Sequence, residues 1–369
     1  MKILLCFGTR PEAIKMAPLY HELQKKSSFE LKVCVTAQHR KMLDQVLNFF
    51  EIVPDYDLDL MQANQSLNGL SAKIISRMDG VLATEKPDLV LVHGDTTTSS
   101  MVALAAFHLG IKVGHIEAGL RTYNKQAPFP EEINRQITSL IADIHFTPTA
   151  AATQNLLNEG ILPTAILETG NTVIDALLLA VGKIETEHYR HPEIERLKRL
   201  IPAHKKMVLV TGHRRENFGA GFEHLCNALL SVSERDDVTI VYPVHLNPNV
   251  KDIVYEKLSD TENICLIPPV SYPVFVWLMQ KSFLIVTDSG GIQEEAPSLG
   301  KPVLVTRTVS ERSEGVKAGF SILVGTDQQK ISTTICSFLD GFSGFGPSIN
   351  PYGTGDASQK IAAYLLKHC

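Results

Sequence analysis

The sequence lacks the features that mark secreted, membrane and nucleic-acid-binding proteins. Its 369 residues carry a formal net charge of −5, so we expect no nucleic acid and no anionic membrane as partner. The six cysteines are scattered without a C-x-x-C spacing, which favours reduced thiols in a cytoplasmic protein over a disulfide framework or a zinc site. The first residues hold only a five-residue apolar run before Gly8. No later run is long enough to span a bilayer, so neither a signal peptide nor a membrane segment is expected.

Two nucleotide-binding signatures are also missing. No G-x-G-x-x-G follows the first expected strand, and G-x-x-x-x-G-K-[ST] occurs nowhere in the chain. We therefore expect neither a bound nicotinamide cofactor nor a phosphate-cutting P-loop, and we predict no cofactor.

The length and an ordinary composition, with 44% hydrophobic and 20% charged residues, favour two globular domains. Short apolar runs rich in β-branched residues alternate with amphipathic segments in both halves. This alternation predicts an α/β protein with two Rossmann-like, doubly wound parallel-sheet domains that face a central cleft. The expected strands are 2–7, 31–36, 88–93, 111–116, 143–148 and 165–169 in the first half, and 207–211, 238–242, 263–267, 283–287 and 302–305 in the second. The expected helices include 11–26, 39–49, 67–85, 97–109, 131–141 and 356–367.

We assign residues 1–170 to an N-terminal domain and residues 171–355 to a C-terminal domain. The polar stretch 183–206 is the expected linker, and the last segment, 356–369, is expected to pack back on the first domain. Thr172 and Asp175 have the spacing of a capping box that opens a helix.

The stretch F-L-I-V-T-D-S-G-G-I-Q-E-E reads as a strand, a two-glycine turn and a helix. Ser289, Gly290 and Gly291 let a ligand approach the backbone, and the unpaired N–H groups of a helix start attract anions. Glu295 could accept hydrogen bonds from two vicinal hydroxyls, as a ribose offers. We interpret Glu294 as an acid that pairs with the helix dipole. The alternative is a glycine turn needed only for tight packing.

The first strand also leads into polar residues. Arg10 stands at the strand-to-helix turn and Lys15 about one helical turn deeper, while Thr9 and Glu12 have the spacing of a capping box. Two cations at the mouth of a parallel sheet suit a diphosphate. The alternative is a solvated arginine and a surface lysine.

Carboxylates follow the next two strands of the first half. Asp95 comes two residues after an expected strand, and Glu117 ends the strand after it. Both should face the cleft, because ligands of open α/β sheets bind beyond the carboxyl ends of the strands. Asp95 could instead cap the next helix. Of Glu131 and Glu132, one should pair with a helix dipole and the other could point into the cleft; the spacing leaves open which.

His213 follows the first strand of the second domain in T-G-H-R-R-E-N, and Arg312 lies in S-E-R-S-E-G. A histidine among arginines suits phosphate or a developing negative charge, and Arg312 adds a possible phosphate contact. The alternative is a histidine that only caps a helix.

Two pairs of possible metal ligands also occur in the sequence. His93 with Asp95, and His115 with Glu117, place two ligand types at alternating positions of two strands. Such side chains need not converge, so we predict no metal.

Distinctive sequence blocks follow one another along nearly the whole chain: F-G-T-R-P-E-A-I-K-M-A-P, T-A-Q-H-R, H-G-D-T-T-T, G-H-I-E-A-G-L-R-T, P-F-P-E-E-I-N-R-Q, T-G-N-T-V-I-D-A-L, G-H-R-R-E-N, Y-P-V-H-L-N-P and D-S-G-G-I-Q-E-E-A-P-S-L-G-K-P-V-L. In collinear order, these blocks resemble those of the non-hydrolysing UDP-N-acetylglucosamine 2-epimerases of bacteria. The resemblance implies a two-domain fold similar to the GT-B glycosyltransferases, a homodimer, and interconversion of UDP-GlcNAc and UDP-ManNAc that supplies ManNAc units for surface polysaccharide such as capsule.

By this resemblance the catalytic positions are Asp95, Glu117, Glu131 and His213. The positions implied to bind the substrate and its UDP are Arg10, Lys15, Asp95, Glu117, His213, Val270, Phe275, Ser289, Gly290, Gly291, Glu295 and Arg312. The positions implied to bind a second, activating UDP-GlcNAc are Gln38, His39, Gln65, Arg214 and His245.

The sequence departs from the family pattern at four positions. Lys41 and Asn64 replace a Gln and an Arg common in members that are activated by substrate. Val270 replaces a frequent Gln, so a uracil contact there must come from the backbone. Ser313 stands where Pro is usual, which should loosen the loop beside Arg312.

The chemistry that fits these residues is elimination and return of UDP. The C2 proton of the sugar has no neighbouring carbonyl, so we expect UDP to leave C1 while a base takes that proton, giving 2-acetamidoglucal. The reverse steps on the other face need a second carboxylate. Which of Asp95, Glu117 and Glu131 is base and which is acid stays open. The alternatives are a hydrolysing epimerase that releases ManNAc and UDP, a glycosyltransferase of the same fold, and a nucleotide-sugar sensor without turnover.

Overall fold

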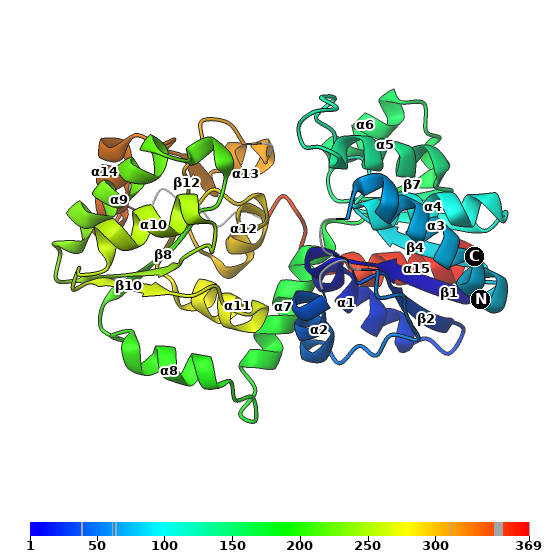
Figure 1. The fold of residues 1–369 in the computed structure, drawn as a ribbon, viewed down its shortest axis with the longest axis horizontal. Helices are drawn as coiled ribbons and strands as arrows, with labels where there is room; N and C mark the ends of the chain where they lie inside the picture. The colour runs from blue at the N-terminus through cyan, green and yellow to red at the C-terminus, as the bar shows by residue number, and fades with distance from the viewer. Residues whose placement is uncertain (38–39, 61, 63–64, 311, 343–349, 369) are drawn as a thin grey trace. The chain divides into compact units, whose positions relative to one another are not determined.

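The computed structural model describes residues 1–37, 40–60, 62, 65–310, 312–342 and 350–368. The chain forms two compact units, each built on its own parallel sheet (Figure 1). Unit 1 is Met1–Leu178 with Tyr352–Cys369, and unit 2 is Leu179–Pro351. The chain therefore passes from one unit to the other inside helix α7 (Thr172–Ile184), whereas the sequence-based boundary lay at 170 and 171.

Unit 1 contains a seven-stranded parallel sheet in the order β3-β2-β1-β4-β5-β6-β7. β1 and β4 are buried along nearly their whole length, as expected of strands covered by helices on both faces. β3 is only two residues long and was not predicted. The strands are β1 (Lys2–Phe7), β2 (Glu30–Val35), β3 (Tyr56–Asp57), β4 (Leu89–His93), β5 (Lys112–Ile116), β6 (Ile144–Thr147) and β7 (Ile166–Glu168).

The helices of unit 1 follow the predicted alternation. The Thr9–Glu12 capping box at the start of α1 is confirmed, and α3 and α4 bury apolar side chains against the sheet. The helices are α1 (Arg10–Gln24), α2 (Arg40–Phe49), α3 (Leu67–Glu85), α4 (Thr97–His108), α5 (Glu131–Ile141), α6 (Ala150–Asn158), the 3₁₀ turn η1 (Pro163–Ala165), α7 and α15 (Ala357–His368).

The C-terminal helix α15 packs against α1 of unit 1. The ring of Tyr364 meets that of Phe146 edge-on, with centroids 5.8 Å apart. The carboxylate of Asp175 accepts hydrogen bonds from the N–H groups of Ala357 (3.3 Å) and Ser358 (2.7 Å). The predicted Thr172–Asp175 capping box is therefore wrong, because Asp175 caps the start of α15 instead.

Unit 2 contains a six-stranded parallel sheet in the order β10-β9-β8-β11-β12-β13. Its strands are β8 (Lys206–Thr211), β9 (Val238–Pro243), β10 (Ile264–Ile267), β11 (Leu284–Thr287), β12 (Val303–Val305) and β13 (Ser321–Leu323), of which β13 was not predicted. Its helices are α8 (Pro192–Leu200), η2 (Arg215–Asn217), α9 (Ala220–Ser233), α10 (Pro248–Leu258), α11 (Tyr272–Lys281), α12 (Gly290–Glu295), η3 (Ala296–Leu299), α13 (Ser313–Lys317) and α14 (Gln328–Leu339). The core of this unit joins the sheet to α9, α10 and α14.

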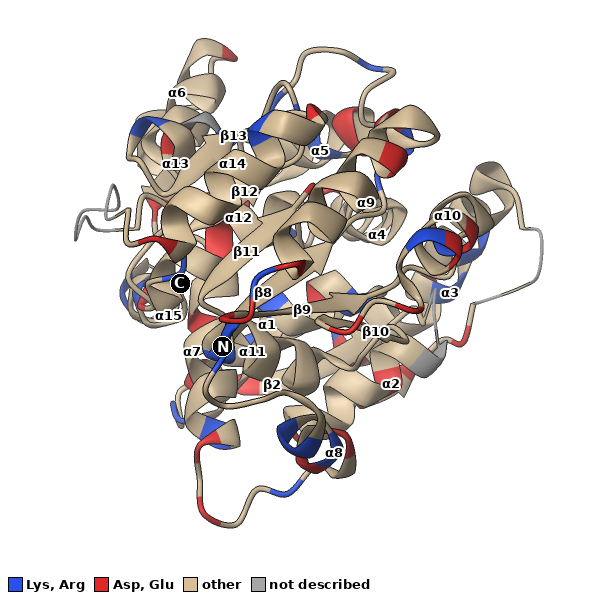
Figure 2. Cartoon of the chain, turned by 90° about the vertical axis from the view of Figure 1, so that its left-hand side faces the viewer, with Lys and Arg blue, Asp and Glu red and all other residues tan. Residues whose placement is uncertain are grey.

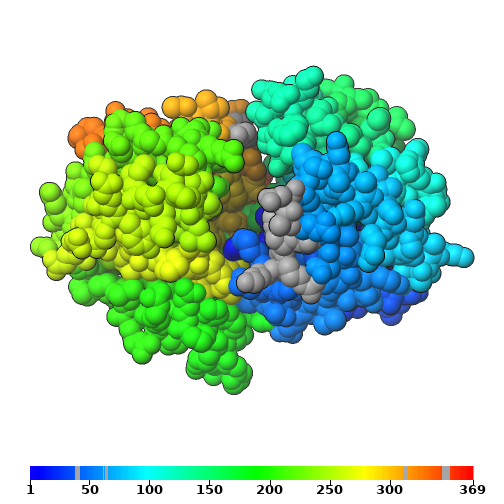
Figure 3. Space-filling view, viewed as in Figure 1, coloured from blue at the N-terminus to red at the C-terminus, as the bar shows by residue number. Residues whose placement is uncertain are grey.

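Helix α8 lies inside the stretch that the sequence marked as a linker. It buries only Ile194 and Leu197, and the rest of it carries acidic residues in its first turn and basic residues in its last turn (Figure 2). Its segment forms the lower edge of unit 2 in the space-filling view (green in Figure 3). High polarity concealed this helix from a search for apolar runs.

The order of the strands predicts where each unit can bind a ligand. In each sheet the first strand of the unit lies between the second strand and a strand from later in the chain, β4 beside β1 and β11 beside β8. Loops leave such a pair in opposite directions and open a crevice at the carboxyl ends of the strands. Within the described residues, no helix is both long and apolar enough to cross a membrane.

Candidate active site

The predicted site residues fall at the switch points of the two sheets. In unit 1, Arg10 follows β1, Asp95 follows β4 and Glu117 follows β5. In unit 2, His213 follows β8, and Ser289 to Gly291 follow β11. Each unit therefore carries its own group of candidate residues.

Glu117 is held in an uncommon conformation. Its φ of +63° lies in the left-handed region, which non-glycine residues rarely adopt. Its side chain, 8% exposed, forms an ion pair with Lys15 and accepts a hydrogen bond from Asn171 Nδ2 at 3.0 Å. Burial alone would raise the pKa of Glu117, but Lys15 and these hydrogen bonds hold it well below its ordinary value. The structure therefore presents Glu117 as a fixed, ionised carboxylate.

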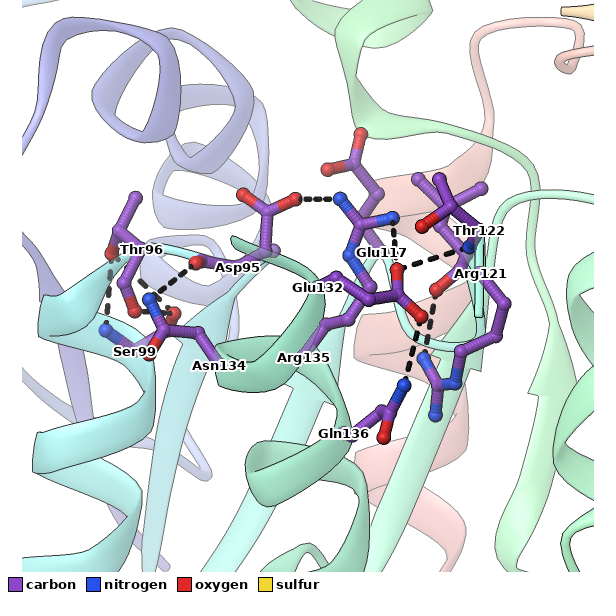
Figure 4. Close-up of polar contacts among 12 residues, drawn as sticks. Asp95, Thr96, Ser99, Glu117, Arg121, Thr122, Glu132, Asn134, Arg135 and Gln136 are labelled. Atoms are coloured by element: carbon purple, nitrogen blue, oxygen red, sulfur yellow. Dashed lines mark hydrogen bonds and ion pairs between the residues drawn. The ribbon is translucent and has the colours of Figure 1, made fainter. Parts of the chain in front are cut away.

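Asp95 does not cap helix α4. Thr96 takes that position and accepts the N–H of Ser99 at 3.1 Å, which leaves the Asp95 carboxylate to pair with Arg135. Asn134 Nδ2 donates to the carbonyl oxygen of Asp95 at 3.0 Å, so helix α5 supports both ends of this residue (Figure 4). Burial outweighs the attraction of Arg135 and raises the pKa of Asp95.

Of the two adjacent acids on α5, Glu132 is the structural one. It is fully buried and accepts the N–H groups of Thr122 (3.0 Å) and Tyr123 (2.9 Å). Its Oε2, which accepts the N–H of Thr122, also lies 3.4 Å from Arg135 Nη1. Figure 4 shows the Arg135 guanidinium between the carboxylates of Glu132 and Asp95. Glu131 is half-buried and has no hydrogen bond or ion pair with any described residue. Of the pair, Glu131 is the one available to a ligand.

A buried carboxylate connects the turn that carries Arg10 to the turn that carries Asp95. Glu12 accepts the backbone N–H groups of Gly8 (3.1 Å) and Thr9 (2.8 Å), and its other oxygen accepts the hydroxyl of Thr96 (2.7 Å). Burial outweighs these hydrogen bonds and raises the pKa of Glu12 to about 7. Glu12 was predicted only as a capping residue, and its reach to the second turn was missed.

The histidines of the two strands do not assemble a metal site. His115 Nε2 lies 2.7 Å from the carbonyl oxygen of Gly94, and burial lowers the pKa of His115 to about 3 and that of His93 to about 4. The described part of the chain contains no group of three His, Cys, Asp or Glu side chains arranged to hold a metal ion.

In unit 2, His213 is oriented by a buried carboxylate. Its Nδ1 lies 3.2 Å from Asp288 Oδ1, and Asp288 Oδ2 accepts the backbone N–H groups of His213 and Arg214, both at 2.9 Å. Burial opposes ionisation of Asp288, but these contacts dominate and lower its pKa. His213 remains 46% exposed and stacks on His245, with ring centroids 5.8 Å apart. Its other ring nitrogen therefore stays available to a ligand.

Ser289 stands at the N-cap position of α12 but makes no capping hydrogen bond with its side chain. At Gly290 a Cβ atom would lie 3.0–3.2 Å from the guanidinium of Arg312, so only glycine fits easily. At Gly291 a Cβ would meet only ordinary contacts of 3.9–4.0 Å. Arg312 Nε donates to Glu294 Oε1 at 2.8 Å. The interpretation of Glu294 as a dipole-pairing acid is therefore wrong, since it fixes Arg312 over the start of the helix.

The remaining predicted contacts of unit 2 lie around α11. Val270 is buried directly before this helix, and Phe275 is half-buried on it. Glu295 is buried at the end of α12, where the hydroxyl of Tyr272 lies 3.4 Å from its Oε1. Ser271 Oγ is buried without a hydrogen-bond partner among the described residues.

The residues predicted for a second nucleotide sugar are divided between the units. Gln38 and His39 lie outside the described residues, as does Asn64, and Gln65 belongs to unit 1. Arg214 and His245 belong to unit 2, on either side of His213. Gln65 Oε1 and Arg214 Nε are buried without a hydrogen-bond partner within the described chain.

Three residues of the site were missed from sequence. Asn171, Arg135 and Asp288 each hold a predicted residue in place: Glu117, Asp95 and His213, respectively. Asp288 gave a signal, because an acid directly after a buried strand needs a partner. Asn171 and Arg135 gave none, since their partners lie 54 and 40 residues away in the chain.

The sequence and the fold match those of known proteins. A family model described as UDP-N-acetylglucosamine 2-epimerase matches residues 21–366. The UDP-N-acetylglucosamine 2-epimerase of Salmonella typhimurium is 53% identical over 372 residues, covering 100% of this chain and 99% of the relative.

Solved structures match equally well along the chain. The UDP-GlcNAc 2-epimerase of Neisseria meningitidis, solved bound to UDP-GlcNAc, is 49% identical with a TM-score of 0.91 and full coverage of both chains. An S. aureus protein solved with UDP is 43% identical with a TM-score of 0.85, covering 100% of this chain and 97% of that one. With a family model matched over most of its residues and relatives matched from end to end, the chain belongs to the UDP-N-acetylglucosamine 2-epimerase family.

Proposed function

We propose that the protein interconverts UDP-GlcNAc and UDP-ManNAc reversibly and without hydrolysis, through elimination and return of UDP by way of 2-acetamidoglucal. The observation that carries the proposal is the pair of carboxylates after the neighbouring strands β4 and β5. Asp95 is paired with Arg135 and Glu117 with Lys15, so each carboxylate has its own cation and its own fixed position.

The chemistry requires such an arrangement. The C2 proton has no carbonyl neighbour to acidify it, so it can leave only as the C1–O bond to UDP breaks. One group must take the proton, and on return another must deliver a proton to the opposite face. The pKa values of Asp95 and Glu117 are moved in opposite directions, upward for Asp95 and downward for Glu117. Two acids separated in this way suit one acid and one base, with Glu131 as the third candidate.

Unit 2 supplies groups for the departing UDP. We assign the diphosphate to Arg312, His213 and the helix start at Ser289 to Gly291, because cations and the N–H groups of a helix start stabilise a leaving dianion. Glu295 is assigned to the ribose hydroxyls, and the backbone at Val270 with the ring of Phe275 to the uracil. In unit 1, Arg10 and Lys15 add positive charge. These assignments follow the family resemblance.

The family implies further properties. We propose a cytoplasmic homodimer that supplies ManNAc units for surface polysaccharide. Support for a subunit contact comes from an exposed apolar surface on unit 1, hereafter the α5 face: Tyr123 is 60% exposed, Leu140 84% and Leu162 69%. A groove of about 520 Å³ lies on the same face, lined by Ile133, Ile137 and Ile161 among others.

A single reaction in deuterated water tests the proposed activity. The protein is incubated with UDP-GlcNAc alone, and the products are followed by ¹H NMR. The proposal predicts UDP-ManNAc, with deuterium at C2 of both UDP-sugars. Free ManNAc as the main product would identify a hydrolysing epimerase instead. Unchanged UDP-GlcNAc without deuterium would identify a sensor, or a transferase that needs an acceptor.

A further inference from the structure

Asn171 lies directly before α7. At this point the C-terminal segment, which starts at Tyr352, returns to unit 1 and contacts it. Asn171 is only 2% exposed and uses its backbone and both side-chain polar atoms. Its backbone N–H donates to the carbonyl oxygen of Tyr352 at 2.7 Å, and its Oδ1 accepts the N–H of Val173 at 3.0 Å. Its Nδ2 donates to Glu117 Oε1 at 3.0 Å.

These contacts determine which way the carboxamide points. The N–H of Val173 can only donate, so the atom that faces it must be the oxygen of Asn171. The amide nitrogen must then face Glu117. A donor fixed by two other hydrogen bonds loses little freedom when it binds a carboxylate. Lys15, the other partner of Glu117, reaches it from α1 on a long, flexible side chain.

Glu117 needs such a constraint because its backbone conformation is unfavourable. A non-glycine residue with φ of +63° persists only where its surroundings hold it. Gly94 also lies close, since a Cβ there would come within 3.2 Å of Glu117 Oε2. Asn171 and Lys15 both bind Oε1 of the carboxylate, and the missing side chain of Gly94 leaves room for Oε2.

We propose that Asn171 is a positioning residue for the epimerisation, which fixes the Glu117 carboxylate in its ionised form and in one orientation. The inference rests on the proposed function, in which Glu117 transfers a proton at C2. Asn171 itself touches no reacting atom. It acts through Glu117, and Tyr352 anchors it to the segment where the chain returns to unit 1.

The groups around Glu117 define what a variant should change. Lys15 on α1 and His93 on β4 lower the pKa of Glu117 by their charges. The charge of Glu117 in turn raises the pKa of Asp95, which lies in the β4–α4 turn. With Lys15 present, loss of the amide donor should leave Glu117 ionised at neutral pH but less strongly so. A carboxylate in place of the amide should oppose ionisation further, because like charges would meet at hydrogen-bond distance.

The test uses Asn171→Ser and Asn171→Asp in the full-length protein. Serine and aspartate are both good N-cap residues, so each can still accept the N–H of Val173 and keep the start of α7. Asn155→Ser is the matched control, because Asn155 Nδ2 donates to the carbonyl of Gly119 at 2.9 Å and to no carboxylate. The measurements are kcat and KM for UDP-GlcNAc from pH 5 to 9, with the thermal midpoint of each variant.

We expect kcat of Asn171→Ser to fall about 10- to 100-fold while KM changes less than about threefold. Between pH 5 and 9 the acidic limb of the kcat profile of Asn171→Ser should coincide with that of wild type, because Lys15 still holds the pKa of Glu117 below this range, whereas that of Asn171→Asp should move to higher pH. Asn155→Ser should lower the thermal midpoint without moving that limb. If Asn171→Asp does not fold, the serine variant alone decides.

A kcat equal to wild type in Asn171→Ser would overturn the inference. Glu117→Gln separates this failure from failure of the proposed function. If Glu117→Gln keeps wild-type uptake of deuterium at C2, the role of Glu117 is wrong, and the role of Asn171 falls with it. If Glu117→Gln loses that uptake while Asn171→Ser matches wild type, only the role of Asn171 is wrong.

Discussion

The two units have the same strand order and opposite chemistry at their switch points. In unit 1 the loops after β1, β4 and β5 carry acids that are paired with cations or held by several donors. In unit 2 the loops after β8 and β11 carry a histidine and a two-glycine helix start, and the loop after β12 carries an arginine that is held over that helix start. One topology thus offers groups for proton transfer in one unit and groups for an anion in the other.

The buried acids of the two units also differ in what they hold. Asp288 of unit 2 accepts N–H groups and orients His213, so it positions another side chain. Asp95 and Glu117 of unit 1 are themselves positioned by other residues: Arg135, Asn134, Lys15 and Asn171. This difference predicts that variants of unit 1 reduce turnover and variants of unit 2 reduce binding of UDP.

The largest effect should come from Asp95→Asn. Asparagine keeps the size of the side chain and a partner for Arg135 but cannot transfer a proton. We expect kcat to fall about 10²- to 10⁴-fold, the range of a single general acid or base. The dissociation constant of UDP, measured by calorimetry, should stay within about twofold of wild type. Turnover within tenfold of wild type would mean that Asp95 transfers no proton.

A smaller effect, on the binding of UDP and not on turnover, should follow from Gly290→Ala in unit 2. The new methyl group would lie 3.0–3.2 Å from the Arg312 guanidinium and displace it. We expect UDP to bind about tenfold more weakly, in keeping with loss of one charge-assisted hydrogen bond. Gly182→Ala is the control, because nothing lies within 4 Å of a Cβ at that position. Equal UDP binding by wild type and Gly290→Ala would separate Arg312 from the diphosphate.

The α5 face offers a test of whether unit 1 also forms the subunit contact. Leu140 is 84% exposed, and Leu140→Asp would place a charge in an apolar interface. We expect light scattering to show a dimer for wild type and a monomer for Leu140→Asp at micromolar concentration. Leu366→Asp is the matched control on α15, where the side chain is 44% exposed. A dimer that survives Leu140→Asp would place the contact elsewhere.

The last prediction concerns the stability of unit 1 and not its activity. The pKa of Glu12 is raised to about 7 in the fold, above its ordinary value of 4.5, so the folded state favours the protonated form. The stabilisation is complete below about pH 4.5 and is lost as the pH rises through 7, amounting to about 3 kcal/mol at most. Urea denaturation should show that the free energy of unfolding of wild type falls over this range more steeply than that of Glu12→Gln. Parallel curves would show that Glu12 does not titrate there.

Much of the fold followed from the pattern of apolar runs. Buried parallel strands are short and strongly apolar, so the central strands and helices such as α3 and α5 were predicted with nearly their observed bounds. The pattern failed for β3 and β13, which are two and three residues long, and for α8, whose surface is charged. These elements are defined by their neighbours in space and not by their own composition.

Part of the site was also predictable from the sequence. Residues that follow a strand or open a helix could be placed at the sheet edge from sequence, as Asp95, Glu117 and His213 were. The partners that fix their orientation could not, because Arg135 on α5 and Asn171 directly before α7 are distant from them in sequence. Spacing also could not separate Glu131 from Glu132. That distinction depends on the backbone of residues 122 and 123, which Glu132 binds.

The most direct test of the central claim is the fate of the oxygen that joins C1 to the β-phosphate. UDP-GlcNAc labelled with ¹⁸O at this bridge is incubated with the protein and recovered, and the label is located by ³¹P NMR. If UDP leaves and returns, the freed β-phosphate can rotate, and the account predicts ¹⁸O in its non-bridging positions. Deuterium uptake at C2 with all of the label still in the bridge would contradict the account.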